Sequence, residues 1–433
     1  MMGDAMAFSN PFDFMSLPPE IRLQIYSHLL NPADNIQPHP THDDCETYHF
    51  ENLLNLLLTS RTVSDEVARL FYSKNTFVRV ETPWEEAQNH IEEQGLIPLI
   101  CVGEKAERFQ RYHLGLEIRC PAYENHMMRH RMGIETHIEP PPSMEFQMPT
   151  CKVVILLEHL SAFCRIWFYS DISNPGGLNG HLDLTVHLQN PNATGGVEAN
   201  APVPKALQQK LLSPLGAVRG LAEIKFQGEV YKSIEQAVRQ EMMKPYVSQE
   251  DCLEQSVALK KRGDEVLKDG KTREAIEIYE KAFYAIHITC KGRRRHIWGD
   301  AFFDKQLASG TYEGQHGEWI RIMLRLKLVS QVVLAYSTLK EYEEAEFWGM
   351  RTIYIMRQRM GVEDDEDTPL IGFPSAGDIG RIYFRTGVAM KEQAKLEDAR
   401  KLLKVAHDYL PEDQEVIAAL RSIGWTPGLT RPF

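Results

Sequence analysis

Apolar residues recur with a helical period close to the N-terminus. Ile21, Ile25 and Leu29 stand four residues apart, and this spacing predicts an amphipathic helix. The strongly apolar run 53–58 predicts a second helix that is buried from several sides. A third helix is expected to begin at 60–62, where apolar residues again recur every three or four positions. The first part of the chain is therefore expected to be a small helical unit.

The pattern changes after this unit. The polar, proline-containing segment 34–49 is interpreted as a loop, and 76–80 as a strand that leaves the helical unit. Farther along, stretches in which apolar and polar residues alternate indicate half-buried strands. Helical stretches separate them, so a mixed α/β layer is expected. The expected strands are 114–120, 152–156, 182–188 and 221–226, and the expected helices are 158–168, 205–212 and 233–243.

The last part of the chain is helix-forming throughout and has a repeat grammar of the 34-residue type. Ala275, Ala345 and Ala399 occupy equivalent positions, where a small side chain lets two helices approach closely. These alanines are 70 and 54 residues apart, more than one repeat length. Insertions between the repeats are therefore expected at about 288–317 and 359–378.

Length fits this division, because 433 residues correspond to two or three ordinary domains. We predict a multidomain α+β protein with a helical domain at 12–82 and a mixed α/β domain at 100–245. An all-α repeat solenoid is expected at 251–425, closed by a capping helix at 412–423.

Charge restricts the choice of partner. The chain has 48 basic and 60 acidic residues, a net charge of −12, which argues against binding to nucleic-acid phosphates. The excess acid is concentrated in residues 1–90, with five basic and 13 acidic residues. Residues 251–433 are almost balanced, with 28 basic and 29 acidic residues. An acidic peptide remains a suitable ligand for this last part.

Compartment is indicated by the cysteines and by the absence of targeting patterns. The seven cysteines are irregularly spaced without a CxxC pair, which favours reduced thiols in a cytoplasmic or nuclear protein. No secretory signal is expected at the N-terminus, where Asp4 interrupts a stretch without an apolar core. The apolar runs are too short to span a bilayer, so no membrane partner is expected.

Catalytic patterns are weak. The segment 270–272 reads Gly-Lys-Thr like the end of a phosphate-binding loop, but Glu265 stands where that loop needs glycine, so a helix–helix turn is expected. The candidate metal ligands are too loosely spaced for a convergent site. They are His113, Cys120, His126, His130 and His137. We expect no catalytic residue, metal or cofactor, and a protein that is not an enzyme.

Three N-terminal segments carry a family resemblance. They are Phe14–Tyr26 (FMSLPPEIRLQIY), 57–61 (LLTSR) and 66–72 (EVARLFY). Together they resemble the F-box-like domain of filamentous fungal proteins, with a long insertion at 31–49. The resemblance implies docking to a Skp-type adaptor of a cullin-type ubiquitin ligase. The residues implied on the adaptor-binding helix are Leu17, Pro18, Ile21, Ile25 and Leu29.

The C-terminal repeats resemble a tetratricopeptide repeat (TPR) domain. The first copy carries the resemblance in Leu259, Gly263, Val266, Gly270, Ala275, Tyr279 and Ala282. Such domains bind peptides in a concave groove, and those of co-chaperones grip the C-terminal tails of heat-shock chaperones through a basic clamp. The positions that the resemblance assigns to the clamp are Lys260, Asp264, Gln331, Arg381 and Arg385.

Three functions follow as hypotheses. The first is a non-enzymatic adaptor that serves as a substrate receptor of a cullin-type ubiquitin ligase, with a TPR groove for a peptide. The second is a chaperone-linked TPR cofactor that binds acidic C-terminal peptides. The third is an enzyme housed in the central α/β domain.

Overall fold

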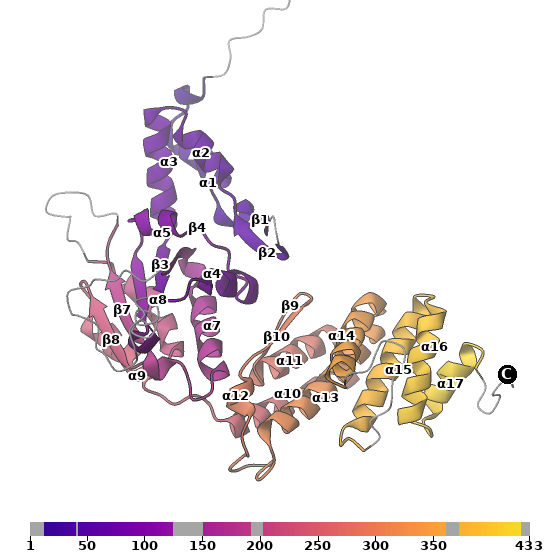
Figure 1. Cartoon of the computed structure of the whole chain (residues 1–433). Coiled ribbons are helices and arrows are strands. Elements are labelled where there is room, and N and C mark those ends of the chain that lie inside the picture. Colours follow the sequence, from indigo (N-terminus) through magenta and orange to yellow (C-terminus); the bar gives the residue numbers. More distant parts are fainter. Residues whose placement is uncertain (1–12, 40–41, 124–149, 192–201, 361–371, 426–433) are drawn as a thin grey trace, which may run out of the picture. The chain divides into compact units, whose positions relative to one another are not determined.

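The computed structural model describes residues 13–39, 42–123, 150–191, 202–360 and 372–425. The chain divides into two compact units, which Figure 1 colours along the sequence. Unit 1 contains the chain up to residue 171 and residues 176–245, and unit 2 contains 172–175 and 246–433. Among the described residues, no helix is both long and apolar enough to cross a membrane.

Unit 1 begins with helices α1 (Pro19–Leu29), α2 (Glu51–Leu57) and α3 (Arg61–Lys74). Helix α3 starts where the sequence predicts, because the Ser60 hydroxyl accepts a hydrogen bond of 3.3 Å from the Val63 N–H and caps the helix. Its predicted apolar face is buried, with Val67 and Phe71 in the core. The three N-terminal helices are therefore confirmed.

The face of helix α1 that is buried differs from the face that its apolar spacing predicts to be buried. Tyr26 and Leu30 are buried, whereas Ile21, Ile25 and Leu29 are 41%, 37% and 38% exposed. The buried stripe is shifted by one residue and includes Arg22. A charged residue can occupy this face only because α3 supplies a partner for it.

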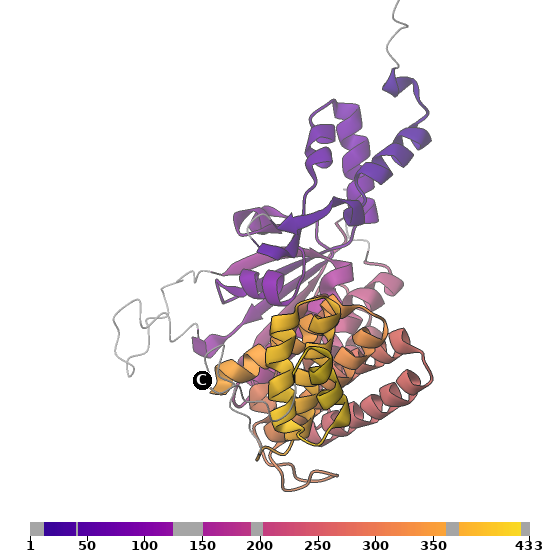
Figure 2. The ribbon, with the colours of Figure 1, turned by 90° about the vertical axis from the view of Figure 1, so that its right-hand side faces the viewer.

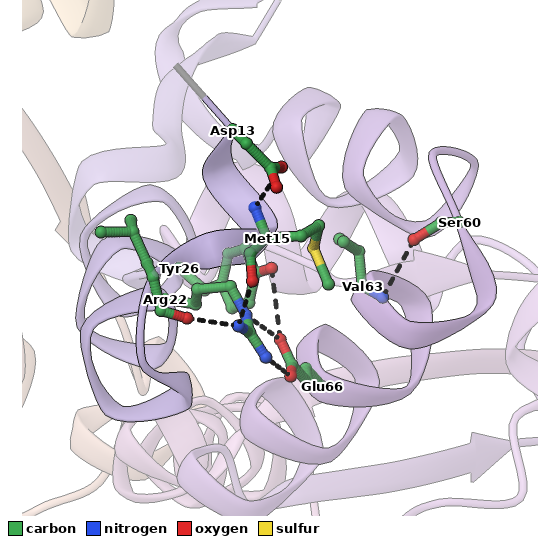
Figure 3. A network of polar contacts seen from close by, with 8 residues as sticks. Asp13, Met15, Arg22, Tyr26, Ser60, Val63 and Glu66 are labelled. Atoms are coloured by element: carbon green, nitrogen blue, oxygen red, sulfur yellow. Dashed lines mark hydrogen bonds and ion pairs between the residues drawn. The ribbon is translucent and has the colours of Figure 1, made fainter.

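That partner is Glu66 of α3 (Figure 3). The Arg22 guanidinium forms an ion pair with the Glu66 carboxylate, and its Nε lies 3.1 Å from Glu66 Oε2. Its Nη1 donates to the carbonyls of Met15 and Leu17 at 3.2 and 2.5 Å. The hydrogen bond from Arg22 lowers the pKa of Glu66. One buried pair thus joins the N-terminal turn, α1 and α3.

Two local predictions in this part are wrong. The segment 34–49 forms an antiparallel hairpin of β1 (Ile36–His39) and β2 (His42–Tyr48) rather than a loop, since Ile36 pairs with Tyr48. Helix α2 is also less buried than predicted, with Leu54 and Leu58 at 63% and 82% exposed. Helix α2 therefore contacts the core along one side.

A mixed sheet forms the rest of unit 1, in the order β4-β6-β3-β5-β7-β8. Strands β3 and β5 are parallel, as are β7 and β8, and the other neighbours are antiparallel. The strands are β3 (Phe77–Thr82), β4 (Cys101–Val102), β5 (Leu114–Arg119), β6 (Cys151–Leu156), β7 (Asp183–Leu188) and β8 (Glu223–Gln227). The mixed α/β prediction is confirmed, and β3, from the end of the predicted helical domain, lies inside this sheet.

Helices of unit 1 share one apolar cluster with the inner side chains of the sheet. Helix α8 has the predicted bounds, and α7 and α9 lie within a few residues of theirs. The helices of this cluster are α4 (Ala87–Asn89), α7 (Leu160–Ser173), α8 (Lys205–Leu212) and α9 (Lys232–Met242). Helix α5 (Glu104–Arg108) instead contributes Ala106 to the cluster of α1 and α3.

Unit 2 is a row of helical hairpins that share one core (Figures 1 and 2). A small hairpin, β9 (Ile288–Lys291) and β10 (Arg294–Ile297), and the short α12 (Asp300–Phe303) occupy the first predicted insertion. The predicted capping helix is α17 (Gln414–Ser422). The hairpins are α10 (Gln249–Lys268) with α11 (Thr272–Ala285), α13 (Gly317–Thr338) with α14 (Tyr342–Met360), and α15 (Ala376–Glu392) with α16 (Leu396–Tyr409).

Small residues let the two helices of each hairpin approach closely. A Cβ on Gly263 would lie 2.5 Å from the ring of Tyr279, so only glycine fits this crossing. Ala275, Ala345 and Ala399, the predicted equivalents, are completely buried. Unit 2 therefore has the hairpin geometry that the tetratricopeptide pattern predicts.

Candidate functional site

A groove of about 490 Å³ runs along one face of unit 2. Three helices contribute to it, α10, α13 and α15, which are the first helices of the three hairpins. Most of its side chains are polar or charged. The lining residues are Lys260, Lys327, Ser330, Gln331, Pro374, Gly377, Asp378, Arg381 and Arg385.

The α10 side of the groove is closed by internal contacts. Lys260 Nζ lies 2.7 Å from Asp264 Oδ2, one helical turn along α10. The other carboxylate oxygen, Oδ1, accepts hydrogen bonds of 2.9 Å from the Tyr279 hydroxyl and from Gln331 Nε2. Burial and the hydrogen bond to Asp264 raise the pKa of Tyr279 well above its usual range. Asp264 thus neutralises Lys260 and ties α10 to α11 and α13.

Arg385 connects this network to α15. Its Nη1 donates to Ser330 Oγ at 2.8 Å and to Gln331 Oε1 at 3.2 Å. Burial lowers the pKa of Arg385 to about 10, and the neighbouring charge of Arg381 acts in the same direction. Among the described residues, Nε and Nη2 of Arg385 have no hydrogen-bond partner, so part of this guanidinium remains available.

Two further cations of the groove keep their full donor capacity. Lys327 on α13 and Arg381 on α15 are exposed, and neither has a hydrogen-bond or ion-pair partner in the described part of the chain. Asp378 is the acidic residue that lines the groove beside them. Among the described residues that line the groove, with Lys260 neutralised by Asp264, the cations Lys327, Arg381 and Arg385 exceed the carboxylate of Asp378 by two charges. Outside the lining, the Glu415 carboxylate also acts on Arg385.

The five residues that the resemblance assigns to a clamp lie together in this network. Four of them line the groove, and Asp264 lies directly behind Lys260. Lys327 does not appear among the predicted residues, although it stands one helical turn before Gln331 on α13. That spacing of four residues was the available signal, because such pairs share a helix face.

The residues predicted to dock an adaptor lie on one exposed stripe. Ile21, Ile25 and Leu29 project outward from α1 at intervals of one helical turn, and Pro18 and Leu17 directly precede this helix. An exposed row of large aliphatic side chains is a feature of protein interaction surfaces. This stripe is the second candidate interaction site of the chain.

The candidate metal ligands of the sequence are only partly among the described residues. His113 is buried, and burial lowers its pKa, while Cys120 is a buried thiol. His126, His130 and His137 lie outside the described residues. Within the described ranges, no group of three or more His, Cys, Asp or Glu side chains could hold a metal ion. The segment 270–272 begins in the turn between α10 and α11, as predicted.

The chain is similar to several solved tetratricopeptide domains. One is the first TPR of Spaghetti (RPAP3) bound to the HSP90 peptide SRMEEVD, with 20% identity, 39% of this chain and 90% of that chain covered, and a TM-score of 0.24. Another is the C-terminal TPR-containing domain of a Plasmodium falciparum FK506-binding protein, with 14% identity, 41% of this chain and 91% of that chain covered, and a TM-score of 0.28.

A third is the second TPR domain of human RPAP3 in complex with the HSP70 peptide SGPTIEEVD. It has 18% identity, 40% of this chain and 99% of that chain covered, and a TM-score of 0.25. No family model matches the sequence, and no curated protein matches it.

Proposed function

We propose that unit 2 is a non-catalytic module that binds an acidic peptide in the groove between α10, α13 and α15. The observation that carries the proposal is the presence of Lys327 and Arg381 in the groove without a partner among the described residues. Cations that stabilise a fold are ordinarily paired, as Lys260 is with Asp264. Cations that outnumber the carboxylates lining the same groove are arranged for an anionic ligand.

The chemistry of the groove suits carboxylates in an extended segment. A guanidinium presents parallel N–H donors that match the two oxygens of a carboxylate, and Arg381 has no acceptor among the described residues. Lys327 adds a flexible point charge from the neighbouring helix. Because the cations come from α13 and α15, a bound segment would contact both helices and be held in one orientation.

This proposal favours the chaperone-linked hypothesis over a ligase receptor for the C-terminal part. Two of the compared structures contain acidic chaperone peptides, SRMEEVD and SGPTIEEVD. Peptides of this composition are the ligand class that we propose for the groove. The heat-shock chaperones that carry such tails are the corresponding partners.

The test is titration of full-length protein with labelled SRMEEVD peptide. Arg381→Gln is expected to weaken binding by about tenfold or more, because it removes a charge-assisted contact. Arg262→Gln is the matched control, since Arg262 is an exposed arginine of α10 that does not line the groove. Equal affinities of the wild type and Arg381→Gln would contradict the proposal.

A second function is proposed for the exposed stripe of α1, docking of a Skp-type ubiquitin-ligase adaptor. The supporting observation is that Ile21, Ile25 and Leu29 are exposed together on one face. Capture of purified adaptor by the full chain is expected, with loss of capture in Ile25→Asp. Met243→Asp is the control, because Met243 is an exposed apolar residue at the end of α9. Failure of the wild type to capture the adaptor would exclude this function.

A further inference from the structure

We infer that the groove recognises the acidic side chains of a peptide rather than its C-terminal carboxylate, and that Asp264 determines this selectivity. The inference rests on the proposed function, since it concerns which part of an acidic peptide is bound. It assigns opposite roles to the two sides of one groove. The α10 side is closed by a carboxylate of the chain itself, and the α13–α15 side is open.

On the α10 side, Asp264 already occupies the donors that an incoming carboxylate would need. Lys260 Nζ, the Tyr279 hydroxyl and Gln331 Nε2 all point at its two oxygens, at 2.7, 2.9 and 2.9 Å. A terminal carboxylate placed here would find one donor of each of these three groups already held by a carboxylate of the chain itself.

It would also meet a like charge. The Lys260 and Asp264 side chains are 21% and 24% exposed, so water screens the repulsion only partly. Asp264 therefore makes this side unfavourable for a chain end.

On the α13–α15 side, the available donors belong to three different cations. Lys327 and Arg381 have no partner among the described residues, and Arg385 retains Nε and Nη2. After Asp378 is counted, two positive charges remain to be matched. Two neighbouring glutamates carry two carboxylates on flexible stems, which can reach α13 and α15 together. A chain end adds one terminal carboxylate on the short backbone, and the side chain of the last Asp of SRMEEVD is the same in the free acid and the amide.

The experiment compares three forms of one peptide on the full-length wild type. They are SRMEEVD as free acid, the same peptide as C-terminal amide, and a form in which glutamine replaces both glutamates. Free acid and amide are expected to bind within twofold of one another. The glutamine form is expected to bind about tenfold or more weakly, because two charge-assisted contacts are lost.

Asp264→Asn then tests the source of the selectivity. It keeps the side-chain shape, removes the negative charge and releases Lys260 for a chain end. The variant is expected to bind the free acid about tenfold more tightly than the amide. Asp269→Asn is the control, because it removes one acidic charge at the C-terminal end of the same helix, away from the groove lining.

The double variant Lys260→Gln/Asp264→Asn gives a second measurement on the same side. It removes both members of the pair and keeps the net charge of the groove, so its affinity for the amide is expected to remain within twofold of the wild type. A wild type that prefers the free acid by tenfold would overturn the inference and leave the proposed function standing. Equal binding of both forms by Asp264→Asn, or a tenfold loss of affinity for the amide in Lys260→Gln/Asp264→Asn, would also overturn it. If none of the three peptide forms binds, the proposed function and the inference are both overturned.

Discussion

Arg22 in unit 1 and Arg381 in unit 2 use the same guanidinium group in different ways. Arg22 is buried on α1 and has a carboxylate and two carbonyls as acceptors (Figure 3). Arg381 is exposed on α15 and has no acceptor in the described part of the chain. The comparison indicates where a cation supports the fold and where it is available to a ligand. Pairing and burial distinguish the two, and residue type does not.

The largest expected effect comes from breaking the paired case. Glu66→Gln leaves the buried Arg22 without its carboxylate and is expected to lower the free energy of unfolding by about 2 kcal/mol. Arg381→Gln is expected to change it by less than about 0.5 kcal/mol, since no partner in the described part of the chain is lost. Urea unfolding of the full chain, followed separately in each unit by hydrogen exchange, measures both. Asp65→Asn, at an exposed acid of α3, is the control for charge removal.

The next effect concerns the packing behind the closed side of the groove. Gly263→Ala places a methyl group against the ring of Tyr279, whose hydroxyl binds Asp264. A loss of about 1–2 kcal/mol in the stability of unit 2 is expected from this overpacking. Thermal unfolding measures it, and Gly377→Ala is the control because a Cβ there meets open space. Equal midpoints for the two variants would show that α10 can shift without cost.

A smaller effect concerns the response of the Arg22–Glu66 pair to acid. The pKa of Glu66 is lowered by Arg22, so this pair stabilises unit 1 fully above the ordinary carboxyl pKa of about 4.3. That stability is lost as the pH falls through the lowered folded-state pKa. In Glu66→Gln, the free energy of unfolding of unit 1 is therefore expected to fall less steeply below pH 5 than it does in the wild type. Urea midpoints across this window, compared with Asp65→Asn, check the sign.

The smallest effect comes from the hairpin turns of unit 2. Gly270, Lys340 and Ala394 occupy equivalent turns with φ of 78°, 61° and 62°, a conformation that costs a side chain about 1 kcal/mol. Lys340→Gly relieves this cost but gives the unfolded chain more freedom, so a gain of about 0.5 kcal/mol or less is expected. Gly270→Ala is expected to lose about 1 kcal/mol in the same thermal assay. The two changes should leave peptide affinity unaltered.

The sequence predicts regular elements well where local pattern and packing agree. Helix α8 has the predicted bounds, since its apolar spacing matches the face that enters the core. The buried face of α1 was not predictable in this way. Ile21 and Arg22 each begin a row of residues spaced four apart, and the two rows lie side by side on the helix. Glu66, 44 residues away, decides between them. The β1–β2 hairpin was missed because its backbone pairing carries little apolar signal.

In the groove, too, the sequence indicates the positions of residues but not their tertiary contacts. Lys260, Gln331, Arg381 and Arg385, which the resemblance assigns to a clamp, lie on the first helices of the hairpins, and their contact with a peptide stays a prediction. The pattern and the resemblance could not show that Asp264 is held by three donors from three helices, because those contacts depend on tertiary packing. Lys327 was not predicted, because it occupies none of the positions that the resemblance assigns to the clamp. Its spacing of four residues from Gln331 is nevertheless visible in the sequence.

The local charge of the groove also has a kinetic consequence. A chain with a net charge of −12 repels an acidic peptide at long range, while the groove attracts it within a few ångströms. At 0.1 M salt the screening length is about 10 Å, so added salt weakens the distant repulsion before it weakens direct contacts. Moderate salt should thus speed the encounter and only higher salt should shorten the residence time. The distribution of charge, more than its sum, would then govern how fast this protein finds its peptide.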